Sequence, residues 1–187
     1  MLNSDAILRV KYPQFDEEQY QPAGIDLRAG ELFEIDNSGK FPAGVFYEGK
    51  HLPKHVPIDA EKMKLPNFDL DGLSEEEILS KMEDSENLRE AEVFRLKPNV
   101  PYLIRTKDRI KAIHAGQIYL SRSTLMRSGI EVLGAFGDPG FETHLIFLVK
   151  NLTNGDYLIE KDARFVQLLD LEVRDLDEKY HGEYDNM

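Results

Sequence analysis

Residues 145–173 read LIFLVKNLTNGDYLIEKDARFVQLLDLEV and carry the clearest structural pattern of the chain. Three β-prone runs, Leu145–Lys150, Tyr157–Ile159 and Phe165–Val173, are rich in branched and aromatic side chains. Polar turns separate them, and the Asn154-Gly155 pair is typical of a hairpin. This stretch therefore predicts successive antiparallel strands rather than strands that alternate with crossover helices.

The same pattern extends toward the N-terminus. Further short β-prone runs between turn residues are Gly24–Leu27, Leu32–Ile35, Val93–Leu96, Tyr102–Thr106 and Gln117–Leu120. Gly30 is expected to form a turn between the first two of these runs, and Ala6–Val10 fits either a strand or a short helix. Many short strands at regular spacing predict a mainly β fold, an antiparallel distorted jelly roll.

Residues 36–92 differ from their surroundings. Four prolines between residues 36 and 66 indicate loop with short pieces of strand. Residues 69–92 hold ten acidic side chains against two basic ones. Ser74 and Glu77 form a capping-box pattern, with Leu73 and Ile78 placed as a hydrophobic staple, which predicts a short helix over about 74–83. We expect one domain over 1–187 with an acidic insertion at about 36–92; a solvated insertion is favoured over a partner-binding element or lid.

Composition excludes several classes of protein. The chain has no cysteine, so disulfides, thiolate nucleophiles and cysteine-based zinc sites are ruled out. Its net charge of −12 disfavours nucleic acid and anionic membranes as partners. No run is long and apolar enough to span a bilayer, and Met1–Tyr12 lacks the layout of a signal peptide. A cytoplasmic protein is expected, in which an anionic ligand would need a local basic pocket or a metal ion.

Two arginines and four hydroxyl side chains lie within residues 121–128, in the segment Ser121-Arg122-Ser123-Thr124-Leu125-Met126-Arg127-Ser128. Arginine offers a planar fork of donors to phosphate oxygens, and a following helical turn would add backbone N–H groups. The alternative is a polar helix start whose arginines pair with surface acids. In an acidic chain, this clustering favours a phosphate-binding cradle.

Two further segments place a carboxylate beside glycines. Asp26 follows Gly24 in Ala23-Gly24-Ile25-Asp26-Leu27-Arg28, and Asp138 stands in the tight turn Gly137-Asp138-Pro139-Gly140-Phe141. A carboxylate held on such a turn can orient and deprotonate a water molecule, and the aromatic ring of Phe141 could pack on a sugar. Asp-Pro-Gly is also common in ordinary turns, so this segment alone does not decide a function.

Taken in order, these segments resemble the motifs of the trimeric dUTPase and dCTP deaminase family. Residues 21–28 resemble its first motif, Ser121–Leu125 its second, Asp138–Phe141 its third, and Arg164-Phe165-Val166-Gln167 its fourth, Arg-x-x-Gln. The resemblance covers most of the chain outside about 36–90. It implies a jelly-roll β-fold and a homotrimer with active sites shared between subunits.

The resemblance also implies roles for single residues. Asp138 would orient the attacking water and contact the sugar 3′-hydroxyl, and Phe141 would press on the deoxyribose. Arg122, Ser123, Thr124, Arg127 and Gln167 would bind the substrate, chiefly its phosphates. Mg²⁺ would be bound mainly through the triphosphate, with Asp26 near it through water, and the ion would offset the acidity of the chain.

Two features of the sequence, one residue and the C-terminal segment, bear on which of the family's two reactions the resemblance implies. The resemblance places a deaminase glutamate ten residues after the turn aspartate, where this chain has Leu148, and Glu142 is the nearest alternative acid. The chain also lacks the glycine-rich tail of dUTPases, and its end at 179–184 is closer to a deaminase. The sequence predicts a dUTP diphosphatase, with a dCTP deaminase or a non-catalytic nucleotide-binding homologue as alternatives. Gly137 and Thr143 depart from the family pattern at the base-binding hairpin.

Overall fold

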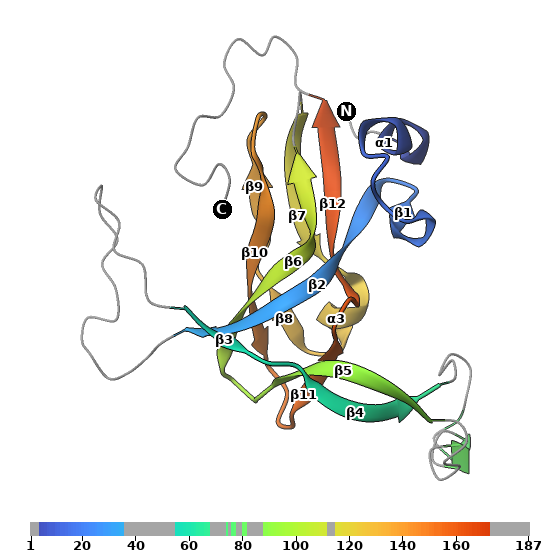
Figure 1. Cartoon of the computed structure of the whole chain (residues 1–187), viewed down its shortest axis with the longest axis vertical. Helices are drawn as coiled ribbons and strands as arrows, with labels where there is room; N and C mark the ends of the chain where they lie inside the picture. The colour runs from blue at the N-terminus through green and yellow to red at the C-terminus, as the bar shows by residue number, and fades with distance from the viewer. Residues whose placement is uncertain are drawn as a thin grey trace, which may run out of the picture.

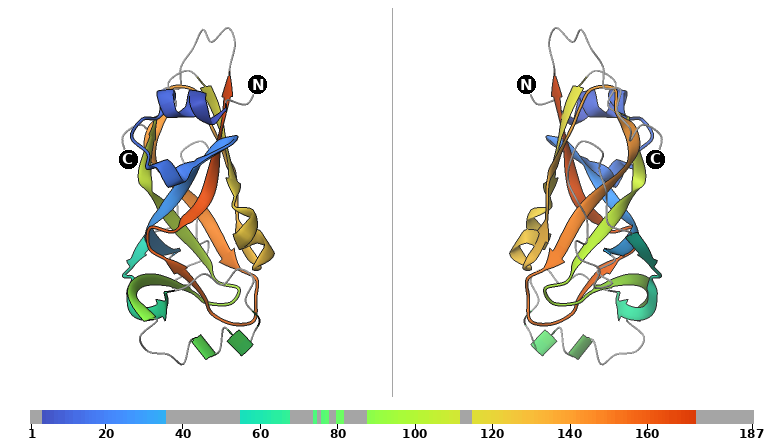
Figure 2. Two further views of the ribbon diagram at one scale, coloured as in Figure 1. Left: turned by 90° about the vertical axis from the view of Figure 1, so that its right-hand side faces the viewer. Right: turned by 90° about the vertical axis from the view of Figure 1, so that its left-hand side faces the viewer.

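The computed structural model describes residues 4–35, 55–67, 74, 76–77, 80–81, 88–111 and 115–172. Strands dominate these residues, and the named strands pair with one another in antiparallel fashion. Figure 2 shows the larger sheet curling on itself, with the N-terminal helix at one end and the smaller sheet at the other. The predicted mainly β fold is confirmed.

The larger sheet holds nine strands within the described residues, and seven of them follow one path. In spatial order these are β8 (Ile130–Val132), β10 (Glu142–Asn151), β6 (Pro101–Lys111), β2 (Gly24–Ile35), β12 (Arg164–Glu172), β7 (Ala115–Ser121) and β9 (Ala135–Gly137). Two more, β1 (Tyr20–Gln21) and β3 (His55–Ile58), pair with β2. The smaller sheet has the order β11 (Tyr157–Glu160), β5 (Leu88–Leu96) and β4 (Glu61–Pro66), as Figure 1 shows.

Three short helical segments with described bounds accompany the sheets: α1 (Asp5–Lys11), η1 (Glu17–Gln19) and α3 (Ser123–Arg127). In α1, Asp5 lies in the first turn and two cations lie in the last, a charge order that complements the helix dipole. Only Leu8 of this helix is buried. The ambiguous segment Ala6–Val10 is therefore helical. No helix within the described ranges has the length and apolarity needed to cross a membrane.

The predicted insertion contributes strands as well as loop. Both β3 and β4 lie within residues 36–66, in agreement with the predicted strand pieces. The predicted capping box forms, because the Ser74 amide donates to Glu77 Oε2 at 2.8 Å and the Glu77 amide donates to Ser74 Oγ at 3.3 Å. Residues 76, 77, 80 and 81 are helical, while the predicted staple of Leu73 and Ile78 lies outside the described residues.

The predicted turn at Gly30 was wrong, because β2 continues through this residue as one strand of 12 residues. The pairing with β6 shifts register here, from Ala29 opposite Thr106 to Glu31 opposite Arg105. A Cβ atom on Gly30 would lie 2.7 Å from the backbone nitrogen of Lys107. This glycine therefore permits a close approach of two strands at a bulge and does not reverse the chain.

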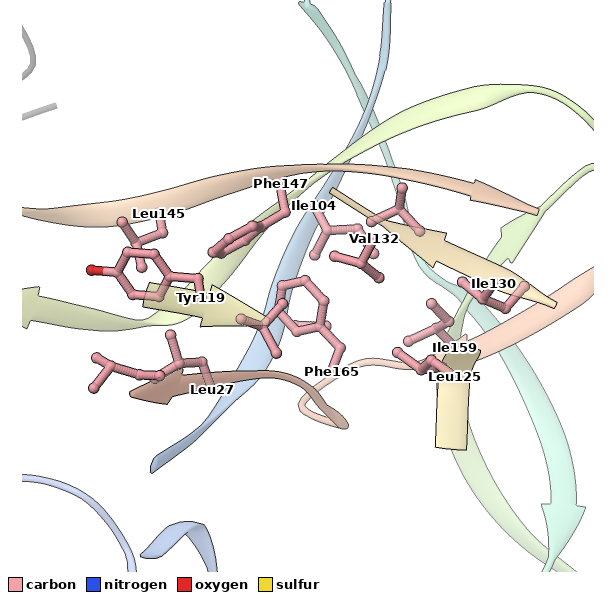
Figure 3. Close-up of a cluster of buried hydrophobic side chains, with 14 of the residues drawn as sticks. Leu27, Ile104, Tyr119, Leu125, Ile130, Val132, Leu145, Phe147, Ile159 and Phe165 are labelled. Atoms are coloured by element: carbon pink, nitrogen blue, oxygen red, sulfur yellow. The ribbon is translucent and has the colours of Figure 1, made fainter. Parts of the chain in front are cut away.

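The core lies inside the curled sheet and is built from the inward-facing residues of its strands (Figure 3). Three aromatic rings form its centre. Phe147 contacts both Tyr119 and Phe165 edge-on, with ring centroids 5.7 Å apart in each pair. All three side chains are buried. This core fixes the relative positions of β7, β10 and β12, the strands from which the candidate site is built.

Candidate functional site

Strands β2 and β12 join the first and fourth sequence motifs. Asp26 on β2 lies directly opposite Gln167 on β12, and Gln167 lies opposite Leu120 on β7, two residues before Arg122. A Cβ on Gly24 would lie 2.5 Å from the carbonyl oxygen of Leu168, so the glycine allows β2 to pack closely on β12. Three segments that are far apart in the sequence are thereby placed side by side.

Asp26 is the buried anion of this region. Its residue is 1% exposed, and its Oδ2 atom has no hydrogen-bond partner within the described part of the chain. The same atom lies 3.2 Å from Arg122 Nε and 3.9 Å from Arg164 Nη1. Burial raises the pKa of Asp26, and the two arginines act in the opposite direction. The carboxylate thus gathers two guanidinium groups at one point.

Backbone contacts hold both arginines in place. The Arg122 amide donates to the Phe165 carbonyl at 3.2 Å, and Arg122 Nη1 donates to the Arg164 carbonyl at 3.4 Å. Arg164 Nη1 also donates to the carbonyl oxygen of Glu18. Both side chains remain about one third exposed, so their other donors can reach a ligand. Arg164 was not predicted as a site residue, although it begins the Arg-x-x-Gln motif.

The short helix α3 begins directly after Arg122. Ser123, Thr124 and Arg127 are exposed on it, while Leu125 is buried and anchors the helix to the core. Within the described ranges, every arginine except Arg127 forms an ion pair with a carboxylate. Of the two arginines of this segment, Arg122 therefore pairs with a buried carboxylate, and Arg127 pairs with none among the described residues.

The Asp138 turn connects β9 to β10. The Phe141 amide donates to the Asp138 carbonyl at 3.3 Å, and Gly140 has a φ of 98°, a conformation that favours glycine. Asp138 is exposed, whereas Pro139 is buried and Phe141 packs partly buried against the core. A rigid turn thus presents a carboxylate to solvent, with an aromatic ring fixed beside it.

The structure does not bring the Asp138 turn and the arginines together in one chain. Gly137 lies opposite Gln117 at one end of β7, whereas Arg122 follows Ser121 at the other end. The stretch of β7 from Gln117 to Ser121 is about 13 Å long, at about 3.3 Å per residue of strand. In Figure 1, β9 lies toward one end of β7 and α3 toward the other.

At the position that separates the two reactions, Leu148 lies on β10 opposite Leu103 of β6 and is half-buried. The alternative acid, Glu142, lies at the other end of β10. It pairs with Lys111 Nζ at 2.8 Å and lies 3.6 Å from Arg109 Nε. The hydrogen bond from Lys111 lowers the pKa of Glu142, so this carboxylate stays ionised and paired.

Among the residues that the structure places, no three His, Cys, Asp or Glu side chains gather closely enough to bind a metal ion. The Oδ2 atom of Asp26, which has no hydrogen-bond partner within the described residues, faces two guanidinium groups, which disfavour direct coordination of a cation there. These residues suit a divalent ion that arrives with an anionic ligand, and they do not form a cage of their own.

Comparison with known proteins adds independent findings. A family model described as dCTP deaminase-like matches residues 3–170. A probable deoxyuridine 5′-triphosphate nucleotidohydrolase of Methanopyrus kandleri is 31% identical over 185 residues, 98% of this chain and 99% of that protein. A protein of the same name from Methanothermobacter thermautotrophicus is 32% identical over 186 residues, with 98% and 99% covered.

Among solved structures, the 2′-deoxycytidine 5′-triphosphate deaminase of Agrobacterium tumefaciens is similar to this chain with a TM-score of 0.56 at 14% identity. The match covers 91% of this chain and 47% of that chain, so this chain spans about half the length of its structural relative. At this identity the similarity shows a shared fold.

Proposed function

The chain belongs to the dCTP deaminase-like family, and we propose that within it the chain is a dUTP diphosphatase that converts dUTP to dUMP and pyrophosphate. The resemblance drawn from the four sequence motifs is confirmed by the family match. The hydrolase reaction is supported by relatives named deoxyuridine 5′-triphosphate nucleotidohydrolase, which align over nearly the whole length of this chain.

The observation that carries the choice of reaction is the aliphatic pair Leu148 and Leu103 on β10 and β6. Removing an amino group from cytosine requires a side chain that transfers protons at the base. Leucine has no titratable proton, and Glu142 is paired at the far end of the strand. Water attack on the phosphate chain then remains as the reaction that the other motifs support.

In the proposed reaction, Asp138 orients a water molecule and accepts its proton as the bond between the first and second phosphates breaks. The water oxygen bonds to the first phosphorus and becomes part of dUMP, and the bridging oxygen leaves with pyrophosphate. Phe141 packs on the deoxyribose and disfavours a sugar with a 2′-hydroxyl. The exposed position of Asp138 on a rigid turn supports the first role, and the partly buried ring supports the second.

Arg122, Ser123, Thr124, Arg127 and Gln167 would bind the phosphates, and we add Arg164, which shares Asp26 with Arg122. Bidentate arginine contacts suit phosphate oxygens. Mg²⁺, bound chiefly by the triphosphate and near Asp26 only through water, would neutralise part of the substrate charge and polarise its phosphates. Arg127, which forms no ion pair within the part of the chain that the structure describes, supports the cradle in particular.

We further propose a cytoplasmic homotrimer whose active sites are shared between subunits. In one chain, about 13 Å of β7 separates the ends that carry the Asp138 turn and the arginines, so a complete site needs the turn of a second copy. Large apolar side chains are exposed on β7 and on the two elements near its ends. Leu120 on β7 is 47% exposed, Met126 on helix α3 65%, and Phe136 on β9 59%. Such a face is suited to burial against another subunit.

The proposal is tested by incubating the purified chain with dUTP, dCTP and dTTP separately in the presence of Mg²⁺, with pyrophosphate and ammonia both measured. Pyrophosphate from dUTP without ammonia from dCTP is the expected result. Asp138→Asn should abolish the release, because an amide accepts no proton from water. Asp156→Asn is the matched control, since Asp156 is an exposed aspartate whose contact is an ion pair with Arg95 at 3.1 Å.

Three outcomes would contradict the proposal. Ammonia release from dCTP would identify a deaminase that uses another proton carrier. Tight binding of dUTP without turnover would identify a nucleotide-binding homologue. Full activity of Asp138→Asn would remove this aspartate from the reaction.

A further inference from the structure

Gly137 immediately precedes Asp138, and its environment explains why a larger residue is excluded. Its backbone lies in β9, and it is not among the glycines with a positive φ. A Cβ atom built on Gly137 would lie 2.8 Å from the hydroxyl of Tyr119 and 3.2 Å from Cε2 of the same ring. The space of a side chain at position 137 is therefore occupied by Tyr119, not by backbone.

Tyr119 cannot easily move away from this contact. Its side chain is 1% exposed, and its ring packs edge-on against Phe147 in the core (Figure 3). Its hydroxyl donates a hydrogen bond to Oε1 of Gln117, which is itself fully buried. A close-packed ring with a fixed hydroxyl acts as a rigid support.

The hydrogen bonds continue from Gln117 to the N-terminal helix. Gln117 Nε2 donates to the Tyr12 hydroxyl, Tyr12 donates to Asp170 Oδ1, and Lys11 Nζ donates to Asp170 Oδ2, each at 2.7 Å. Burial raises the pKa of Tyr12 and of Tyr119, so both hydroxyls remain protonated and able to donate. The chain of donors runs in one direction and ends on a buried carboxylate.

We propose that Tyr119 is a positioning residue for the Asp138 turn. Its hydroxyl is held by the buried hydrogen bonds through Gln117, Tyr12 and Asp170. It sets the distance of Gly137 from the core and thereby the position of the Asp138 carboxylate. This inference rests on the proposed hydrolysis of dUTP. Tyr119 touches no reacting atom. It acts through Gly137, whose neighbour would orient the water.

The test is a double-mutant comparison of Gly137→Ala, Tyr119→Phe and the combination. Gly137→Ala forces its Cβ against the Tyr119 hydroxyl, which displaces the turn. A misplacement of about 1 Å can lower the rate by about a hundredfold, so we expect kcat for dUTP to fall by between about tenfold and a hundredfold. In the proposed trimer the phosphate-binding arginines of the same site belong to another subunit and are not displaced, so KM should change by less than about threefold.

Removing the hydroxyl should restore the turn. Tyr119→Phe in the Gly137→Ala background removes the 2.8 Å contact and leaves the 3.2 Å contact with Cε2, which a shift of a few tenths of an ångström relieves. We therefore expect kcat to return to within about threefold of Tyr119→Phe alone. Gly155→Ala is the matched control, because a Cβ at Gly155 would meet nothing within 4 Å, and it should leave kcat and KM unchanged. All assays are run well below the thermal midpoint of each variant, so that a loss of stability cannot reduce kcat.

The thermal midpoint of each variant is a second readout that needs no activity. The midpoint of Gly137→Ala should be lower than that of the unmodified chain. The midpoint of the double variant should be close to that of Tyr119→Phe alone. If the unmodified chain releases no pyrophosphate from dUTP, the proposed hydrolysis is refuted. The coupling between positions 119 and 137 can still be measured from the thermal midpoints. Unchanged kcat in Gly137→Ala, or a double variant that is as impaired or as insoluble as Gly137→Ala, would overturn the role of Tyr119.

Discussion

Hybrid trimers built from two inactive variants should recover activity, because the arginines and the Asp138 turn lie at opposite ends of β7. The two ends are about 13 Å apart along the strand, which exceeds the reach of a hydrogen bond through one water. One variant carries Asp138→Asn and an intact set of arginines. The other carries Arg122→Ala and an intact turn. Each homotrimer alone should be inactive or nearly so.

The expected magnitude follows from the symmetry of a ring. In every mixed trimer, about one of the three interfaces places an intact cradle beside an intact turn. Random mixing at equal amounts gives mixed trimers in about three quarters of cases, so about one quarter of the unmodified activity should return. Selecting mixed trimers with two different affinity tags should raise this to about one third.

The assay is pyrophosphate release from saturating dUTP after co-expression of the two variants and purification on both tags. A mixture of the separately purified homotrimers, measured before any exchange, is the control and should stay inactive. Mixed trimers with no activity would show that each site is built within one subunit. Static light scattering that gives a monomer would refute the shared site directly.

Two further predictions concern the sugar and the buried aspartate. Phe141→Ala should reduce the ratio of kcat/KM for dUTP to that for UTP by at least about tenfold. Phe141→Tyr keeps the ring and should retain the ratio. An unchanged ratio in Phe141→Ala would show that the ring does not select the sugar. The raised pKa of Asp26 means that ionisation of this carboxyl group costs the folded state stability. The free energy of unfolding of Asp26→Asn should therefore increase relative to that of the unmodified chain as the pH rises from about 3 to about 7. Urea unfolding across this range measures the difference, and a difference that shrinks with rising pH would mean that Arg122 and Arg164 outweigh burial.

The sequence was sufficient for the class of fold and for the short motifs. Alternating β-prone runs predicted most of the strands, including β10, β11 and β12, because each has several branched or aromatic residues between clear turns. Three-residue strands such as β8 and β9 were missed, since so few residues show no period of their own. Gly30 was misread because a bulge and a turn both require glycine, and only the partner strand distinguishes them.

The sequence predicted which residues form the candidate site, but it did not predict which of them contact one another. The pairing of Asp26 with Arg122 and Arg164 depends on the register of β2 against β12, which no local pattern specifies. The chain of hydrogen bonds from Tyr119 to Asp170 links residues that are far apart in the sequence, and tyrosine and glutamine in a strand give no signal of it. Such contacts come from tertiary packing.

The distribution of ion pairs bears on how an acidic chain would accept the proposed tetra-anionic substrate. With 35 acidic residues against 23 basic ones, most described cations are already paired, as in the contacts of Arg28 with Asp108 and of Lys107 with Asp162. A paired arginine gives little extra attraction to a phosphate because its charge is already offset. Arg127 is the arginine that forms no ion pair within the described residues, and Arg122 and Arg164 share one buried carboxylate between them. Two guanidinium groups against one carboxylate leave an excess of about one positive charge at Asp26, and Arg127 adds a further positive charge to the same segment. We expect this local excess to favour phosphate, in contrast to the acidic surface elsewhere.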